Sequence, residues 1–427
     1  MKIAIIGAGI AGNVAASRLH PQHDITVFEA GGHVGGHSHT HQLDLDGRQV
    51  AVDTGFIVYN ERTYPEFTRL LRELEVPTQP SNMSFSVRCE ASGLEYNGTT
   101  LNSLFAQRSN LFRPSFHRMW RDILRFNRHA PVAVAADDGE LTLGRYVREH
   151  GYSPQFIRHY LMPMAAAIWS ATPVDVYAMP ARFLVGFFRN HGMLSVNDRP
   201  QWRTIEGGSA RYVERLVAPF RHRIQLRTPV ESVRRVATHV LVTPRGGEPQ
   251  RFDRVFFACH SDQALAMLAD ASPLERVVLG AMRYQQNDVT LHTDVRLLPR
   301  RRLAWAAWNY HLPMQAADRV CVTYNMNILQ GLQTREPLCV TLNRAGAIDP
   351  ARVLRQVSYA HPVFNTAAVA AQSRHRELNG RQLSYYCGAY WRHGFHEDGV
   401  WSALQALRHF AADEEEGDAQ RALYRAG

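Results

Sequence analysis

A glycine-rich turn near the N-terminus constrains the fold more than any other feature. The apolar run Lys2–Ile6 predicts a short strand, and residues 13–19 predict a helix. Between them, Gly7, Gly9 and Gly12 form the pattern GxGxxG. In a dinucleotide-binding turn the first glycine permits the sharp bend, the second lets a pyrophosphate approach the backbone, and the third lets helix and strand pack closely. The pattern therefore predicts an α/β fold with a Rossmann-like binding unit.

An acidic residue follows the turn at the spacing that such a unit requires. Residues 24–29 predict a second strand, and Glu29 ends it, about 20 residues after the glycines. Its carboxylate is placed to accept hydrogen bonds from the hydroxyls of an adenosine ribose. Because a carboxylate here disfavours the 2′-phosphate of NADP, the sequence predicts FAD or NAD.

Two further motifs distinguish the chain from a plain NAD enzyme, which would usually continue into another helix after the second strand. One is a second glycine loop, EAGGHVGGHSHTHQ, and the other is the turn VDTG. Their candidate cofactor-binding residues are Gly35, Gly36, His37, Thr40, Asp53 and Gly55.

Together these motifs resemble the flavin-containing amine oxidase and phytoene desaturase superfamily, which carries a GxGxxG turn, an acid, a GGR-x-x-T loop and a D-x-G turn. The resemblance implies a non-covalently bound FAD. It also implies that the strand around Val230 passes the adenine with its backbone. Gly388 and a helix that starts at Gly399 and Val400, with Asp398 as its N-cap, would face the flavin ring.

Several other segments, among them LHTD, VTYNMN, HPVF and GFHEDG, are similar to a bacterial branch of predicted NAD/FAD-binding oxidoreductases. The similarity covers nearly the whole chain. Genes of that branch often neighbour relatives of cyclopropane-fatty-acid synthase, which implies a lipid acyl chain as the substrate.

The expected fold class is a two-domain α/β protein, in which a Rossmann-like FAD-binding domain carries an inserted helical and β substrate domain. Segments 1–59, 202–282 and 372–427 are assigned to a discontinuous FAD-binding domain. Segments 60–201 and 283–371 are assigned to the substrate domain, because the first is mostly helical and the second is rich in aromatic strands.

The chain contains 48 basic residues, of which Lys2 is the only lysine. This excludes a P-loop and a lysine Schiff base. It also excludes the flavin-side lysine of amine oxidases, whose place is taken by Asn287-Asp288. The resemblance therefore implies flavin binding and leaves amine oxidation in doubt.

A flavin oxidoreductase needs few catalytic side chains, because the flavin itself accepts the hydride. Histidines that titrate near neutrality are candidate general bases. The candidates from segments expected to border the cavity are His292, His311 and His396, with Tyr310 beside them. Aromatic residues that could line a tunnel or belong to the core are Trp305, Trp308, Tyr390 and Trp391.

Two alternative chemistries are weighed against this interpretation. In an extended stretch His37, His39 and His41 would share one face and could hold a metal, but no cysteine or acid completes the shell, so no metal is expected. Cys387 could attach the flavin covalently, yet its position just before Gly388 favours a buried strand residue.

Charge and hydropathy bear on partners and location. The formal net charge is +9, and residues 115–129 form a basic amphipathic pattern that suits either packing on its own domain or contact with a membrane. Five scattered cysteines favour a reducing compartment, and no apolar run reaches the roughly 18 residues of a membrane span. We expect a cytoplasmic protein, with peripheral contact at the inner face of the membrane as an option, and no nucleic-acid partner.

The sequence thus predicts an FAD-dependent oxidoreductase that oxidises or desaturates a hydrophobic substrate, a fatty acyl chain or lipid, by hydride transfer to flavin N5. Three alternatives stay open. They are oxidation of a small amine, FAD-dependent isomerisation of a polyene, and a non-catalytic role as a lipid-binding flavoprotein.

Overall fold

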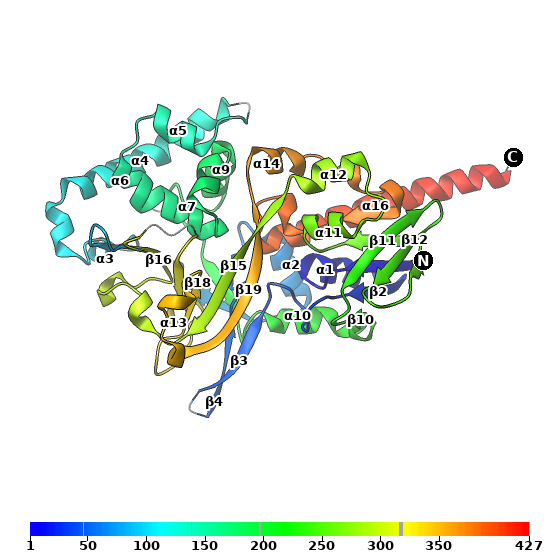
Figure 1. The fold of residues 1–427 in the computed structure, drawn as a ribbon, viewed down its shortest axis with the longest axis horizontal. Helices are drawn as coiled ribbons and strands as arrows, with labels where there is room; N and C mark the ends of the chain where they lie inside the picture. The colour runs from blue at the N-terminus through cyan, green and yellow to red at the C-terminus, as the bar shows by residue number, and fades with distance from the viewer. Residues whose placement is uncertain (46, 138, 196–197, 316–318, 427) are drawn as a thin grey trace.

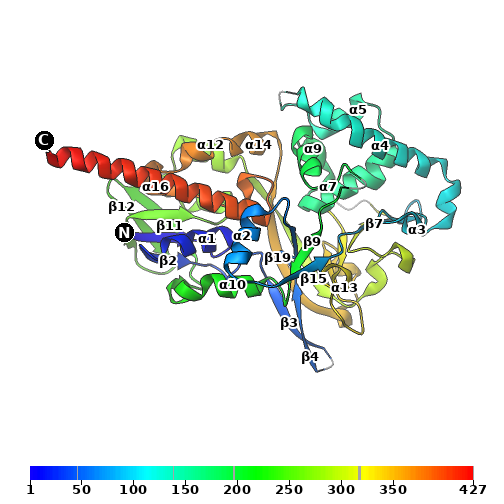
Figure 2. The same ribbon diagram turned by 180° about the vertical axis from the view of Figure 1, so that it is seen from behind.

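The computed structural model describes residues 1–45, 47–137, 139–195, 198–315 and 319–426. Its elements form two parts that lie side by side (Figure 1). One part holds a parallel sheet near the N-terminus, and the other holds a larger sheet and a group of helices. The long helix α16 (His396–Ala426) runs along the first part, as the view from behind also shows (Figure 2).

The first part is built on a five-stranded parallel sheet whose alternate residues enter two different cores. Ile3 and Ile5 pack toward one layer, whereas Ala4 and Ile6 pack toward the opposite layer, as the two-residue period of a strand requires. In spatial order the strands are β10 (Ile224–Gln225), β2 (Asp24–Phe28), β1 (Lys2–Ile6), β14 (Arg254–Phe257) and β20 (Ser384–Tyr386).

Two layers cover this sheet. One consists of α1 (Ile10–Leu19), α10 (Ala210–Val217) and α16, and its core also takes up α2 (Pro65–Glu73). The other layer consists of the antiparallel strands β11 (Val230–Val236), β12 (His239–Pro244) and β13 (Gln250–Phe252), with α11 (Ser261–Met267), α12 (Pro273–Gly280), α14 (Thr366–Gln372) and α15 (His375–Leu378).

The second part is built on a seven-stranded mixed sheet. Only β16 and β7 pair in parallel, and the other neighbours are antiparallel. The spatial order is β19 (Val353–Val363), β15 (Arg283–His292), β18 (Cys339–Leu342), β17 (Val322–Asn325), β16 (Trp308–Leu312), β7 (Phe85–Cys89) and β8 (Leu94–Asn97). The short helix α13 (Met326–Leu329) follows β17.

A group of helices packs beside this sheet around the buried aromatic residues Phe126, Tyr146, Phe156 and Phe188. It comprises α3 (Leu101–Leu104), α4 (Pro114–Ala135), α5 (Leu143–Glu149), α6 (Pro154–Phe156), α7 (Met162–Trp169), α8 (Pro173–Ala178) and α9 (Ala181–Asn190). A π-helical turn, Ile157–Leu161, joins α6 to α7.

Two small sheets connect the parts. The hairpin of β3 (Thr40–Leu45) and β4 (Arg48–Asp53) projects from the molecule (Figure 1). The other sheet places β9 (Trp202–Ile205) between β5 (Val58–Asn60) and β6 (Thr78–Ser81). Both sheets lie close to the places where the chain passes between the two parts.

The strands of the two larger sheets come from different segments of the chain. All strands of the parallel sheet fall in segments 1–59, 202–282 and 372–427, and all strands of the seven-stranded sheet fall in segments 60–201 and 283–371. One difference is α2, which lies in a segment assigned to the substrate domain but buries Phe67, Leu70 and Leu71 in the core of the parallel sheet. Among the described residues, no helix is long and apolar enough to cross a membrane.

A buried ion pair ties the antiparallel layer to the parallel sheet. Arg235 of β11 donates hydrogen bonds from both terminal nitrogens of its guanidinium to the two carboxylate oxygens of Glu275 on α12. The hydroxyl of Tyr386 on β20 donates to the same carboxylate. Burial alone would raise the pKa of Glu275, but the hydrogen bond from Arg235, followed by that from Tyr386, outweighs it and lowers the pKa to about 2. The carboxylate is therefore charged throughout the neutral range.

We predict that Glu275→Gln lowers the free energy of unfolding by about 3–5 kcal/mol, because it removes the more deeply buried of the two carboxylates, Glu275 and Asp270, that pair with the buried guanidinium of Arg235. Urea denaturation monitored by circular dichroism measures the change. The matched control is Glu377→Gln, whose partner Arg374 is exposed, and it should cost no more than about 1 kcal/mol. Equal losses for both variants would contradict the role given to the buried pair.

Candidate active site

The first glycine turn brings backbone rather than side chains to the wall of a large cavity. Gly7 has a φ of +107°, and a Cβ there would lie 2.7 Å from the carbonyl oxygen of Ala258. A Cβ on Gly12 would lie 1.9 Å from the carbonyl oxygen of Gly7, so α1 can pack on the turn only with glycine at this position. A Cβ on Gly9, in contrast, would meet no atom within 4 Å. This open position is the one that a pyrophosphate needs.

Glu29 ties the first turn to the second glycine loop. Its Oε2 accepts a hydrogen bond from the backbone N–H of Ala8 at 2.8 Å, and its Oε1 accepts one from Gly31 at 2.6 Å. The residue lines the cavity directly after β2. The carboxylate therefore stands where a ribose of a dinucleotide is expected.

The second glycine loop lies in backbone contact with the first. Gly35 and Gly36 have φ values of +125° and +59°. The N–H of Gly35 donates to the carbonyl oxygen of Ala8 at 2.8 Å, and a Cβ on Gly36 would lie 3.1 Å from the Cα of Gly9. Both loops line the same end of the cavity.

Asp53 holds the second glycine loop in place from the side that faces away from the cavity. Its carboxylate accepts hydrogen bonds from the backbone N–H of Ser209 at 3.0 Å, from the hydroxyl of Thr40 at 2.5 Å and from the amide of Gln330 at 3.1 Å. Burial raises the pKa of Asp53 to about 6, against the lowering effect of the hydrogen bonds from Thr40 and Ser209. Neither Asp53 nor Thr40 is part of the cavity wall, so they position the loops and α10.

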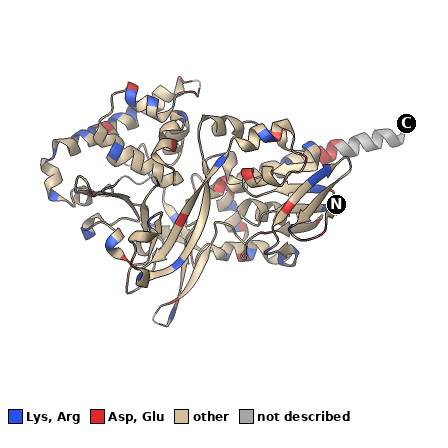
Figure 3. Cartoon of the chain, in the orientation of Figure 1, with Lys and Arg blue, Asp and Glu red and all other residues tan. Residues whose placement is uncertain are grey.

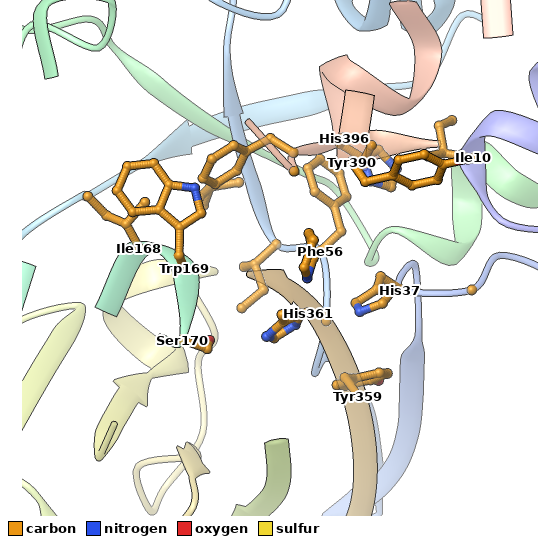
Figure 4. Close-up of a pocket in the computed structure, with 18 of the residues that line it drawn as sticks. Ile10, His37, Phe56, Ile168, Trp169, Ser170, Tyr359, His361, Tyr390 and His396 are labelled. Atoms are coloured by element: carbon orange, nitrogen blue, oxygen red, sulfur yellow. The ribbon is translucent and has the colours of Figure 1, made fainter. Parts of the chain in front are cut away.

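The cavity has a volume of about 1270 Å³, beyond the roughly 300–1,000 Å³ of a usual small-molecule site. It extends from the glycine loops past His37, Phe56 and Tyr390 toward Trp169 of α7 (Figure 4). The predicted cofactor-binding residues in its wall are Gly7, Gly9, Glu29, Gly35, Gly36, His37, Gly55, Val230 and Gly388.

Other predicted cofactor-binding residues pack behind this wall. Gly12, Thr40 and Asp53 do so as described above. Helix α16 begins at His396, three residues before the predicted Gly399, so Gly399 and Val400 lie within its first turns. A Cβ on Gly399 would lie 2.6 Å from Cγ2 of Ile10, which shows that this glycine allows α16 to approach α1.

A cluster of rings occupies the middle of the cavity. The ring centre of His37 lies 4.9 Å from that of Tyr359, 5.4 Å from that of His361 and 6.4 Å from that of His260. Burial, followed by the neighbouring histidines, lowers the pKa of His37 to about 4, that of His361 to about 3 and that of His260 to about 4. All three rings are therefore neutral at physiological pH.

Several buried polar atoms in the cavity wall have no protein partner. They include Nε2 of His37, the hydroxyl of Tyr390 and the indole N–H of Trp308. Buried polar groups of this kind nearly always bond to something, so the wall is built for a polar ligand. The open backbone at Gly9 and the carboxylate of Glu29 fit a dinucleotide at the other end.

Comparison of the sequence with protein families gives one match, to the family described as flavin containing amine oxidoreductase, over residues 10–306. The chain belongs to this family. The residues of the cavity fit its flavin, and the protein is an FAD-dependent oxidoreductase.

Solved structures share the fold at low sequence identity. Cyclohexylamine oxidase from Brevibacterium oxydans IH-35A has 16% identity and a TM-score of 0.69, over 97% of this chain and 99% of that chain. A CLA-producing fatty acid isomerase from P. acnes has 15% identity and a TM-score of 0.68, over 95% of this chain and 98% of that chain. A search of curated proteins finds no match. These likenesses show the fold and leave the substrate open.

Of the three histidines that the sequence suggests as general bases of this flavoenzyme, His396 lines the cavity and the other two do not. His396 lines the cavity, where its ring stacks on Phe56 at 3.8 Å and its Nε2 lies 2.5 Å from the hydroxyl of Tyr212. Burial, followed by His37, lowers the pKa of His396 to about 3. The ring is thus a neutral, firmly held part of the wall.

His292 and His311 lie outside the cavity wall. His292 is fully buried, with Nε2 at 2.7 Å from the hydroxyl of Thr341 and Nδ1 accepting the N–H of Asp294 at 3.0 Å. His311 bonds to Glu90 at 2.9 Å at the end of β16. Neither is placed to reach a substrate in the cavity, and the same holds for Tyr310, which is buried in the core of the helical group.

His361 is a cavity residue that sequence reasoning missed. Its Nδ1 lies 3.2 Å from the amide nitrogen of Asn287, and Asn287 in turn accepts the amide of Asn343 at 2.8 Å. The sequence points to this region only through Asn287-Asp288, the stretch that the resemblance places at the flavin-side lysine of amine oxidases. Since Nδ1 accepts from the Asn287 amide, the neutral ring of His361 keeps its proton on Nε2 and offers an N–H donor.

The two alternative chemistries find no support in the side-chain geometry. His33 stacks on His39, and His39 lies against His41, but among the described residues no group of three or more His, Cys, Asp or Glu side chains is arranged to hold a metal. Cys387 is fully buried after β20 and lies outside the cavity wall.

Of the four candidate aromatic residues, Trp308 and Tyr390 line the cavity, whereas Trp305 and Trp391 do not.

We predict that Gly9→Ala weakens FAD binding at least tenfold and leaves the stability of the FAD-free protein unchanged within about 0.5 kcal/mol, because the new methyl group enters only the space of the pyrophosphate. Fluorescence titration with FAD and thermal melting measure the two effects. The matched variant Gly12→Ala should instead destabilise the FAD-free protein, since its Cβ meets a carbonyl oxygen. Equal FAD affinity for Gly9→Ala and wild type would contradict this site.

The lowered pKa values of the cavity histidines also predict a pH dependence of stability. The unfolded chain takes up protons below the ordinary histidine pKa of about 6.5, whereas the folded His361 stays neutral down to about 3. Stability is therefore fully present above about pH 6.5 and falls as the pH is lowered toward 3, by up to about 1.4 kcal/mol per pH unit for each such histidine.

We predict that His361→Gln makes this decline shallower in the FAD-free protein, as followed by the urea midpoint between pH 7 and pH 4. The control is His129→Gln on the exposed side of α4, which should keep the wild-type slope. An unchanged slope for His361→Gln would show that this ring does not titrate as described.

Proposed function

We propose that this flavoenzyme oxidises or desaturates a hydrophobic substrate, and specifically a fatty acyl chain. The observation that carries the proposal is the apolar half of the cavity. Asn127, Ser170 and His191 also line this part of the cavity, but most of its wall is formed by aromatic and aliphatic side chains of α4, α7 and α9 and their surroundings. They are Tyr96, Trp120, Ile123, Leu124, Tyr160, Met164, Ile168, Trp169 and Phe187.

The charges around the cavity favour an uncharged chain over an amine. Among the described residues of the wall, the carboxylates are Glu29 and Glu231, and both belong to the dinucleotide-binding part. A protonated amine in the apolar half would therefore lose its hydration without a counter-charge, which costs several kcal/mol. A hydrocarbon chain pays no such penalty and gains roughly 0.8 kcal/mol for each buried CH₂ group.

The bound FAD supplies the hydride acceptor, and the protein supplies placement and exclusion of water. The apolar wall holds a chain along the cavity and keeps water from the reacting carbon atoms. His361, fixed by Asn287, offers its N–H to a polar group in the middle of the cavity. The rings of Phe56 and His396 form a stacked pair that closes the cavity on the side of α16.

Anaerobic reduction of the enzyme-bound flavin tests this proposal. We predict that long-chain fatty acids or phospholipids bleach the visible flavin band and that small amines do not. Ile168→Asn, which puts an amide into the apolar half, should slow the bleaching by about tenfold or more. The control Val174→Asn, at an exposed position on α8, should react like wild type.

The alternatives give different outcomes in the same experiment. Bleaching by amines alone would identify an amine oxidase. Rearranged double bonds without an electron acceptor and without lasting bleaching would identify an isomerase. A flavin that binds lipid and is never reduced would identify a non-catalytic lipid-binding flavoprotein. Each of these results would contradict the proposed oxidation.

A further inference from the structure

Helix α4 has one face in the cavity wall and another face on the surface. Trp120, Ile123, Leu124 and Asn127 line the cavity, and their spacing places them on one side of the helix. Leu124 is also 56% exposed. Its position on the helix lies between the cavity side and the surface side, so it stands at the rim of the cavity.

The surface side of α4 is basic. Arg118, Arg121 and Arg128 follow at helical spacing around Leu124 and are exposed. Figure 3 shows basic residues along this helix. No hydrogen bond or ion pair connects these three arginines to any residue that the structure describes.

The exposed arginines have no exposed acidic neighbour on their own helix. From residue 98 to residue 135 the sequence contains one acid, Asp122. Its side chain is nearly buried, accepts the backbone N–H of Ser153 at 2.9 Å and pairs with Arg125 at 3.2 Å. The surface of α4 therefore carries a local positive charge.

Apolar side chains project from the same helix and from its N-terminal end. Phe112, just before α4, is 86% exposed, Leu111 is 45% exposed, and Val132 near the other end is 73% exposed. Val132 lies on the same stripe as Arg121, Leu124 and Arg128.

We propose that this basic face of α4, made of Arg118, Arg121, Leu124, Arg128 and Val132, docks on an anionic lipid bilayer together with Phe112, which lies just before the helix. The chemistry is complementary, because the arginines meet the phosphates while their stems and the apolar side chains enter the acyl boundary. Each basic residue near an anionic membrane surface contributes to attraction. Docking requires no turnover, so this inference goes beyond the proposed function. A docked enzyme would have the rim of its cavity at the bilayer surface.

Vesicle flotation of the FAD-loaded enzyme tests the docking directly. We predict binding to vesicles of phosphatidylcholine with phosphatidylglycerol, much weaker binding to pure phosphatidylcholine, and a loss of binding as salt is raised from roughly 0.1 M to 1 M. The variant Arg118→Glu/Arg121→Glu/Arg128→Glu should reduce the bound fraction on anionic vesicles at least tenfold. Phe112→Ser/Leu124→Ser should weaken binding to both kinds of vesicle.

The matched control is Arg276→Glu/Val277→Ser on α12, which changes an exposed basic and an exposed apolar residue away from α4 and should bind like wild type. A dye on Phe112→Cys should shift to an apolar signal with anionic vesicles, and a dye on Val277→Cys should not. Absence of wild-type binding to anionic vesicles at roughly 0.1 M salt, or equal loss in the α12 control, would overturn the proposal. These readouts need no substrate, so they stand apart from the flavin-reduction experiment.

Discussion

The structure depends on the backbone contact between two glycine loops. Gly12 lets α1 rest on the carbonyl of Gly7, and Gly36 lets the second loop rest on Gly9. Any side chain at these points would hold the loops apart. Because the contact is made by backbone, one end of the cavity presents peptide groups and open space. The carboxylate of Glu29 then locks both loops together through two N–H donors.

The remainder of the site is arranged outward from this contact. Asp53 links the second loop to the start of α10, and the same loop carries His37 into contact with Tyr359 and His361 of the long strand β19. The cavity therefore passes from the parallel sheet to the seven-stranded sheet without an intervening wall. Its polar end suits a dinucleotide, and its far end is lined mainly by apolar side chains, as the proposed oxidation of a hydrophobic substrate requires.

Local signals in the sequence predict the local features well. The GxGxxG turn and the acid at Glu29 each depend on a few neighbouring residues, and each is found in the structure. The partnership of His361 with Asn287 arises from the pairing of β15 with β19, which no neighbouring residue encodes. The start of α16 was misplaced because Asp398 accepts the N–H groups of His393 and Phe395 before it, instead of capping the helix after it.

The central claim is that the cavity holds FAD without a covalent bond. Its most direct test is the visible spectrum of the purified protein, followed by acid precipitation and identification of the flavin by chromatography. We predict a yellow protein whose colour passes entirely into the supernatant as intact FAD. A colourless protein that takes up no added FAD, or a flavin that stays in the pellet, would contradict it.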